Sequence, residues 1–281
     1  MPRNPAKTQY RNHNAYGGIR PAREWKPVRR EDKLPNLRDF NTHNPKCPLH
    51  LNSNFSLELP HLGISVLFQQ IEARLCWEIN STAEGEFIFV AIAWLTSTPI
   101  LTALASARDR KVIVLVVVQK ETWIRQGKSL TKFDRRVRNH YEDLGGYNTH
   151  KDLEELLGSF VNPGEKWSFN DNKLGQARKG CDVAAVRCLG VHAKWTGRMH
   201  HKFMVFGRKQ VFFTATKVLT GSYNFSSAAE AGLENVIIIN HPEVAARYAK
   251  EFVTILLHSE PLDWVSEQMQ PTFTCEPQTF M

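Results

Sequence analysis

Two uninterrupted apolar runs constrain the fold of this chain more than any other feature. They read FIFVAIAWL, at residues 87–95, and VIVLVVV, at residues 112–118. A helix needs roughly 20 apolar residues to span a membrane, so both runs are too short for that role. Both have the length of a strand, and continuous hydrophobicity is typical of a strand that is covered on both faces. We therefore expect two central strands and no integral membrane segment.

Helical patterns flank these runs. Apolar residues recur at helical spacing from Ile64 to Leu75, which predicts an amphipathic helix over residues 65–79. Between the two runs, Thr98 and Pro99 form a start signal for a helix that extends to the region of Arg108. The order helix, strand, helix, strand is typical of a layered α/β domain.

The second half of the chain continues the pattern after a polar insertion at residues 120–180. Strand-like segments return at residues 183–191, 202–207, 210–222 and 234–240, and the apolar positions after Pro242 indicate a closing helix. We predict the α/β class, as a layered α/β/α sandwich with a central mixed β-sheet. The predicted main domain covers residues 59–258, and residues 259–281 are expected to form an irregular C-terminal tail.

Residues 1–58 are predicted to form a basic, largely irregular N-terminal arm. Residues 1–46 hold eleven Lys and Arg against four Asp and Glu, so they carry +7 of the formal net charge of +8. Such an arm favours contact with nucleic acid or another acidic surface, but a solubilising leader has the same composition. Residues 1–23 lack acidic side chains, as a mitochondrial transit peptide does, yet their Pro and Asn are unfavourable for an amphipathic helix.

The polar insertion contains a run of charges. A basic segment at residues 132–138 is followed by an acidic one at residues 142–155. A solvated helix face explains such a run, and a groove that contacts a polyanion is the alternative.

The cysteines favour an intracellular, cytoplasmic protein. Five cysteines, an odd number without a compact framework, fit reduced thiols, and no apolar leader follows Met1. Cys47 with His50, and Cys188 with His192, have spacings that a zinc ion can use. The two pairs are far apart in the sequence, so incidental thiols are the preferred interpretation, and we predict no metal site and no cofactor.

One short stretch concentrates titratable side chains at the start of a strand. It reads MHHKFMVFG, at residues 199–207, and it is followed by GSYN at residues 221–224 and by EN at residues 234–235. The spacing His-x-Lys decides nothing by itself, because His192 and Lys194 repeat it. The downstream residues make the set informative.

This set has the parts that cleavage of a phosphodiester needs without a metal ion. A neutral imidazole can attack phosphorus, and a second, protonated imidazole can protonate the leaving oxygen. Lys202 can hold the charge of the non-bridging oxygens, and Ser222 and Asn224 can donate hydrogen bonds to them. Glu234 can fix one ring nitrogen of a histidine as a donor. A helix start near Ser226 would offer further backbone N–H groups.

These residues resemble the signature of the phospholipase D superfamily, H-x-K-x4-D followed by G-S-x-N. The resemblance covers roughly residues 60–258 and implies the superfamily's fold and a phosphodiesterase activity. It implies that His200 is the nucleophile or acid, that Lys202 binds phosphate and that Glu234 orients the histidine. The expected catalytic residues are His200, Lys202, Asn224 and Glu234, and the expected phosphate-binding residues are Ser222, Gly221 and His201.

Two departures from the signature bear on activity. Gly207 stands where the signature has an aspartate, and the spacer from there to Gly221 is longer than is common in the family. The aspartate is thought to support the site rather than to form the covalent bond, so we expect activity to survive. The chain also has one copy of the motif, whereas the chemistry requires two histidines. The resemblance therefore implies a homodimer in which His200 of each chain faces a shared site.

Three functions from different classes fit these observations. The leading hypothesis is an endonuclease that cleaves DNA or RNA through a phosphohistidine intermediate, because the arm is basic and a single motif resembles the nuclease branch. A phospholipase D-type lipid hydrolase uses the same chemistry, but the sequence has no obvious interfacial amphipathic helix. A degenerate nucleic-acid-binding module that keeps the phosphate site without turnover is the third.

Overall fold

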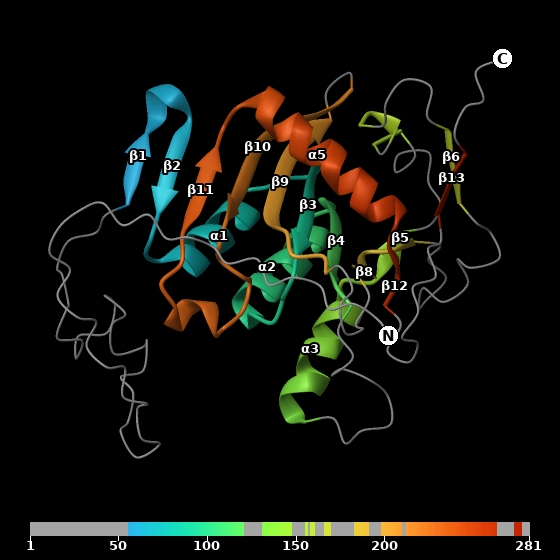
Figure 1. Ribbon diagram of the computed structural model, residues 1–281, viewed down its shortest axis with the longest axis horizontal. Coiled ribbons are helices and arrows are strands. Elements are labelled where there is room, and N and C mark those ends of the chain that lie inside the picture. Colours follow the sequence, from blue (N-terminus) through green and yellow to red (C-terminus); the bar gives the residue numbers. More distant parts are fainter. Residues whose placement is uncertain are drawn as a thin grey trace, which may run out of the picture. The chain divides into compact units, whose positions relative to one another are not determined.

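A mixed β-sheet forms the core of the part of the chain that the structure describes (Figure 1). The computed structural model describes residues 56–120, 131–147, 155–156, 158–160, 166–169, 183–190, 198–209, 212–262 and 273–276. Within these ranges the main sheet has nine strands in the order β1-β2-β11-β10-β9-β3-β4-β8-β12. Nearly all of the predicted basic arm lies outside the described residues, as do Cys47, His50 and His192.

The two apolar runs form neighbouring strands in the middle of this sheet. Strand β3 (Glu86–Ile92) pairs in parallel with β4 (Ile113–Gln119), which pairs in parallel with β8 (Val186–Leu189). On its other side β3 pairs antiparallel with β9 (Lys202–Lys209), which pairs with β10 (Phe213–Gly221), and β10 pairs with β11 (Val236–Ile239). The prediction of a mixed central sheet in an α/β protein is confirmed.

Alternate side chains of the central strands enter two cores on opposite faces of the sheet. Ile88, Val90 and Ile92 of β3 pack in a core with helices α1 (Ile71–Asn80), α2 (Thr98–Asp109) and α3 (Lys132–Asp143). Phe87 and Phe89 pack in the other core with α5 (Pro242–Leu257), which crosses β10, β9 and β3 in Figure 1. This division assigns every second residue of a strand to the same face.

The helix predicted over residues 65–79 begins later than expected. Residues Ile64–Leu67 form strand β2, which pairs with β11 and with the edge strand β1 (Leu57–Leu59); the 3-10 turn η2 (Pro60–Leu62) joins β1 and β2. Gln70 has a positive φ of 52° and precedes α1. The sequence Ile-Ser-Val-Leu fits both the helical and the strand period. Pairing with the apolar strand β11 makes this segment a strand.

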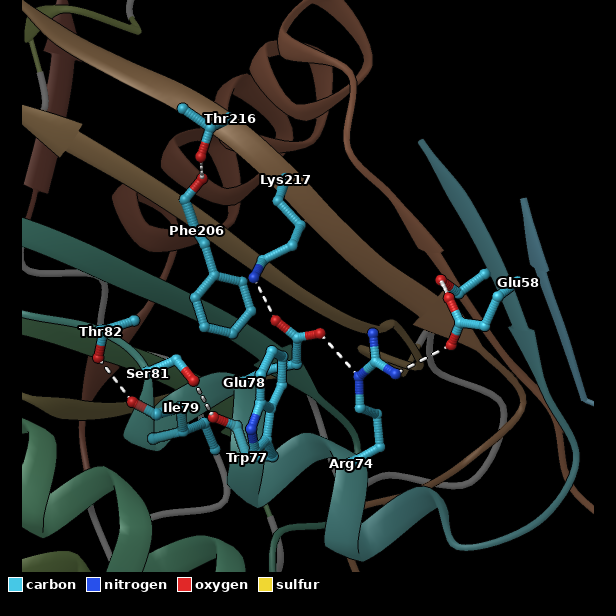
Figure 2. A network of polar contacts seen from close by, with 11 residues as sticks. Glu58, Arg74, Trp77, Glu78, Ile79, Ser81, Thr82, Phe206, Thr216 and Lys217 are labelled. Atoms are coloured by element: carbon cyan, nitrogen blue, oxygen red, sulfur yellow. Dashed lines mark hydrogen bonds and ion pairs between the residues drawn. The ribbon is translucent and has the colours of Figure 1, made fainter. Parts of the chain in front are cut away.

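A network of charged residues joins α1 to the sheet (Figure 2). Glu78 of α1 is buried and accepts hydrogen bonds from Nε of Arg74, at 2.8 Å, and from Nζ of Lys217 on β10. Nη1 of Arg74 lies 2.9 Å from Oε1 of Glu58 on β1. Because a buried carboxylate is stable only when it is paired, the helix is fixed to strands at both ends of this network.

Helix α3, in the polar insertion, is mostly solvated. Thr131 caps α3 through a capping box with Asp134, and Lys132, Arg135 and Arg136 are exposed. The prediction of a solvated helix face is confirmed for this segment. The remaining strands here are short pairs, β5 (Gly146–Tyr147) with β7 (Val183–Ala184) and β6 (Lys166–Phe169) with β13 (Phe273–Glu276).

Two short segments of the predicted irregular C-terminal tail form strands. Strand β12 (Glu260–Pro261) pairs with β8, and β13 also belongs to the predicted irregular tail. Polar contacts explain the docking of β12: Nε of the buried Arg187 donates to Oγ of Ser259 at 2.7 Å, and Lys120 forms a buried ion pair with Glu260. Burial lowers the pKa of Arg187 to about 10. Arg187 and Lys120 belong to no periodic pattern in the sequence, so the pairing of β12 was not predicted.

Candidate active site

The three parts of the sequence signature meet at one edge of the sheet. Lys202 begins β9 and pairs with Ile92 at the end of β3, while Gly221 ends β10 and pairs with Val236 at the start of β11. Thr220 pairs with Phe203, so the start of β9 lies beside the end of β10. The start of β9, the end of β10 and the start of β11 therefore lie at the same edge of the sheet.

Gly221 allows two backbones to approach closely at this edge. A Cβ atom on Gly221 would lie 2.1 Å from the carbonyl oxygen of Asn235, which no side chain permits. The close approach lets the backbone N–H of Ser222 donate to that oxygen at 3.1 Å. In return, the N–H of Asn235 donates to Oγ of Ser222 at 3.1 Å, and the Ser222 hydroxyl donates to Glu234. Ser222 is thus fixed from three directions.

Lys202 lies against the imidazole of His200. Its Nζ is 3.2 Å from Nδ1 and 3.3 Å from Nε2 of His200. Burial lowers the pKa of His200, and the positive charges of Lys202, Arg198 and His201 lower it further. Burial also lowers the pKa of Lys202, and the negative charge of Glu234 opposes that shift. The lowered pKa favours a neutral His200 at neutral pH, which is the form that can attack phosphorus.

The predicted contact between Glu234 and the histidine is absent from the described part of the chain. Glu234 accepts a hydrogen bond from Ser222 and interacts electrostatically with Lys202, whereas the His200 ring contacts Lys202 and Trp94. The strand order explains the difference. Glu234 precedes β11 and His200 precedes β9, with β10 between them, so the two backbones are separated by two strand spacings, roughly 10 Å.

Asn224 has a buried amide oxygen without a hydrogen-bond partner among the described residues. Buried polar atoms normally have partners, so such an atom in a candidate site suggests a group that meets a ligand. The amide can turn to present its nitrogen in the same place, and a phosphate oxygen would select that orientation.

A hydrogen-bond network below the site holds the backbone on both sides of Asn224. The hydroxyl of the buried Tyr223 donates to Oε1 of Glu230 at 2.5 Å, and the backbone N–H of Glu72 donates to the same oxygen at 3.1 Å. On the other side, the N–H of Ser97, which caps α2, donates to the carbonyl of Phe225 at 2.9 Å. Burial raises the pKa of Tyr223, and the contact with Glu230 raises it further. No role was predicted for Tyr223 or Glu230 from the sequence.

His201 lies apart from the predicted phosphate site. Its Nε2 is 3.3 Å from Oε1 of Glu251 on α5, and its ring packs edge-on against Phe203 at a centroid distance of 5.5 Å. Phe203 belongs to the core on the α5 face. Because neighbouring residues of a strand point to opposite faces, His201 is directed away from the face of Lys202. The prediction that His201 binds phosphate is not supported by this placement.

The glycine at the aspartate position of the signature has a steric explanation. A Cβ atom on Gly207 would lie 2.1 Å from Cζ of Phe87 and 2.5 Å from the carbonyl oxygen of Thr214. The position also lies five residues along β9 from Lys202, which is about 16 Å. The ring of Phe87 occupies the space that an aspartate would need, and the site is built without a side chain here.

The predicted helix start near Ser226 is also replaced. The segment forms a turn, in which the N–H of Ala229 donates to the carbonyl of Ser226 at 3.0 Å, and a 3-10 turn η4 (Ala229–Ala231). Ser226 donates its own N–H to the carbonyl of Asn224 at 2.7 Å. These N–H groups are used within the turn, so the expected α-helical N-terminus does not contribute to the site.

Two features of the described residues bear on cofactors and membranes. No group of three or more His, Cys, Asp or Glu in these residues could hold a metal ion. Cys188, one of the cysteines considered for zinc, is buried, and its Sγ lies 3.8 Å from Oε1 of Glu260. None of the described helices combines the length and the apolar character that crossing a membrane requires.

The fold is an α/β fold, and a histidine and a lysine lie against each other at one edge of its sheet. The family model described as the cardiolipin synthase, PLD-like domain matches residues 75–256. The chain therefore belongs to the phospholipase D-like family, and its general class is that of the phosphodiesterases of this superfamily.

Individual relatives resemble the chain at low identity. An uncharacterized protein of Acanthamoeba polyphaga mimivirus is 27% identical over 217 residues, which cover 76% of this chain and 72% of the relative. Among solved structures, NucT from Helicobacter pylori is 16% identical with a TM-score of 0.42, covering 70% of this chain and 98% of its own. Nuc from Salmonella typhimurium, a phospholipase D family member, is 17% identical with a TM-score of 0.40, covering 70% of this chain and 97% of its own.

Proposed function

We propose that the protein is a metal-independent endonuclease that cleaves DNA or RNA through a phosphohistidine intermediate on His200. The observation that carries this proposal is the meeting of His200, Lys202, Ser222 and Glu234 at one sheet edge, with Lys202 held against the imidazole. The nearby amide of Asn224 and the basic arm both suit a polyanionic substrate.

The first chemical step transfers the phosphoryl group to the enzyme. A ring nitrogen of neutral His200 forms a bond to phosphorus, and the bond between phosphorus and the leaving oxygen breaks. The leaving oxygen takes a proton from a second imidazolium. Lys202 and Asn224 hold the negative charge on the non-bridging oxygens. Water then attacks phosphorus, gives a proton to the second imidazole and breaks the P–N bond, which restores His200.

The second imidazole is proposed to be His200 of another copy of the chain. The adjacent His201 pairs with Glu251 on the α5 face, so it is poorly placed to protonate a group bound beside Lys202. A homodimer with an isologous interface would bring two His200 side chains to one shared site. Sedimentation equilibrium should then give twice the 32.2 kDa mass of the chain, and a concentration-independent monomer contradicts the shared site.

Cleavage assays test the activity itself. The full chain and its His200→Ala variant are incubated with single- and double-stranded DNA and RNA, with and without excess EDTA. The proposal predicts cleavage by the wild type in EDTA and none by His200→Ala, while circular dichroism shows an unchanged fold. Loss of cleavage on chelation contradicts the mechanism, and salt-sensitive binding without cleavage identifies a binding module instead.

A further inference from the structure

A tryptophan stands exposed beside the predicted nucleophile. Trp94 follows β3 and retains 40% of its side-chain exposure, although the seven residues before it, 87–93, are almost fully buried. Its indole lies edge-to-face with the imidazole of His200, with ring centroids 6.1 Å apart and planes at 87°. A large aromatic side chain that is 40% exposed is thus placed beside His200.

The backbone around Trp94 is fixed on both sides. The N–H of Ala93 donates to the carbonyl of His201 at 3.0 Å, and the N–H of Thr96 donates to the carbonyl of Phe225 at 2.8 Å. Leu95 is fully buried, and its carbonyl accepts the hydroxyl of Tyr141 at 2.5 Å. Trp94 is therefore held between the segment that carries His200 and the segment that carries Asn224. A preorganised aromatic group of this kind loses little conformational freedom when a ligand binds.

We propose that Trp94 is a stacking platform for a nucleobase next to the scissile phosphate, and that the site prefers single-stranded nucleic acid. This inference rests on the proposed nuclease function. The cations of Lys202 and Arg198 attract the phosphate, and the adjacent indole offers a flat apolar surface to the base of the same or the neighbouring nucleotide. Bases in a duplex are paired and stacked on one another, so only an unpaired base can occupy this surface.

The test compares an aromatic with an aliphatic substitution. Stacking of a base on an aromatic side chain contributes to the free energy of binding. Its loss should therefore reduce kcat/KM for a single-stranded oligonucleotide by roughly 5- to 150-fold. Trp94→Leu should show this loss and Trp94→Phe should retain most activity. Trp77, which is 59% exposed on α1, provides a matched control, and Trp77→Leu should cleave like the wild type.

Modified substrates separate the possible outcomes. Abasic sites on both sides of the scissile phosphate should lower cleavage by the wild type and abolish its advantage over Trp94→Leu. Equal cleavage by the wild type and Trp94→Leu overturns the stacking inference but leaves the nuclease proposal intact. The wild type and both variants are also tested on phosphatidylglycerol vesicles. If the protein binds and hydrolyses these vesicles, and if Trp94→Leu does so as well as Trp94→Phe, then Trp94 serves an apolar lipid contact and the inference is overturned.

Binding measurements keep the inference testable if turnover fails. Fluorescence anisotropy with the His200→Ala protein should give a Kd for the labelled single strand that rises about 5-fold or more on adding Trp94→Leu. An unchanged Kd overturns the stacking role. Absence of cleavage by the wild type on any nucleic acid overturns the proposed function separately.

Discussion

Restoring the signature aspartate at Gly207 should destabilise the protein rather than improve it. A Cβ atom at this position would lie 2.1 Å from Cζ and 2.3 Å from Cε1 of Phe87. Carbon atoms in favourable contact are about 3.5 Å apart or more, so the ring would have to move by about 1.4 Å. Phe87 is fully buried, and the rings of Phe89, Phe160 and Phe213 surround it at centroid distances of 4.6, 5.8 and 6.2 Å. The core has no room for this movement.

The expected loss in the free energy of unfolding follows from overpacking and desolvation. Forcing a methyl group into a packed core costs about 1–3 kcal/mol and occasionally more, and the contact with the Thr214 carbonyl at 2.5 Å adds to the strain. We expect Gly207→Ala to lower the free energy of unfolding by about 3 kcal/mol. Gly207→Asp also buries a carboxylate, which raises the expected loss to about 5 kcal/mol. That loss approaches the whole stability of many domains, so this variant should be largely insoluble.

Urea denaturation followed by tryptophan fluorescence measures these losses. The midpoint for Gly207→Ala should fall by about 1 M or more, since the slope is typically 1–3 kcal/mol per molar urea. Gly158→Ala is the matched control, because a Cβ atom there meets nothing within 4 Å. Phe87→Leu should partly relieve the cost of Gly207→Ala, because it removes the clashing ring atoms but leaves Thr214 in place. A Gly207→Asp variant that is as stable as the wild type refutes this reasoning.

Three further substitutions test the electrostatics and the support of the site. Burial and the neighbouring cations, Arg198 among them, lower the pKa of His200, so Arg198→Gln should raise that pKa and move the acid limb of the pH profile of kcat/KM to higher pH. Tyr223→Phe removes the hydrogen bond to Glu230 and should lower kcat by about 10-fold with little change in KM, because the loop that carries Ser222 and Asn224 loses its support. Glu78→Gln leaves two cations without their buried carboxylate and should lower the free energy of unfolding by about 3 kcal/mol in urea titrations.

Each of these has a control or a contradicting result. Arg208→Gln, at the far end of β9, should leave the acid limb in place, and an identical shift in both variants would contradict the local explanation. An unchanged kcat in Tyr223→Phe would show that the loop is held without Glu230. Equal urea midpoints for Glu78→Gln and the wild type would show that the network of Figure 2 is not required for stability.

The central strands were predictable because burial on both faces leaves a local signal. The runs at residues 87–95 and 112–118 admit one interpretation, and β3 and β4 confirm it. Residues 64–67 were ambiguous, since four apolar and small residues suit both periods, and the pairing of β2 with β11 is a contact across the chain. The pairing of Glu260–Pro261 with β8 depends on Arg187 and Lys120, which carry no pattern.

The sequence allowed the residues of the candidate site to be chosen, but it did not allow most of their contacts to be predicted. The signature residues share one sheet edge because the antiparallel register of β9, β10 and β11 brings them there. The roles of Glu234 and His201 depend on strand order and on the alternation of side chains, so their contacts with Ser222 and Glu251 emerged only from the structure. Trp94 had a possible signal, an aromatic residue at the end of a buried strand, but only the fold places it beside His200.

Trapping the covalent intermediate tests the central claim most directly. Wild type and His200→Ala are mixed with an oligonucleotide that carries ³²P at the scissile phosphate, quenched rapidly in alkaline denaturant, and analysed by gel electrophoresis and peptide mapping. The account predicts a label on the wild type that is stable to alkali, labile to acid and located on His200, with none on the variant. Cleavage that proceeds at full rate with no labelled protein, or a label on another residue, contradicts it.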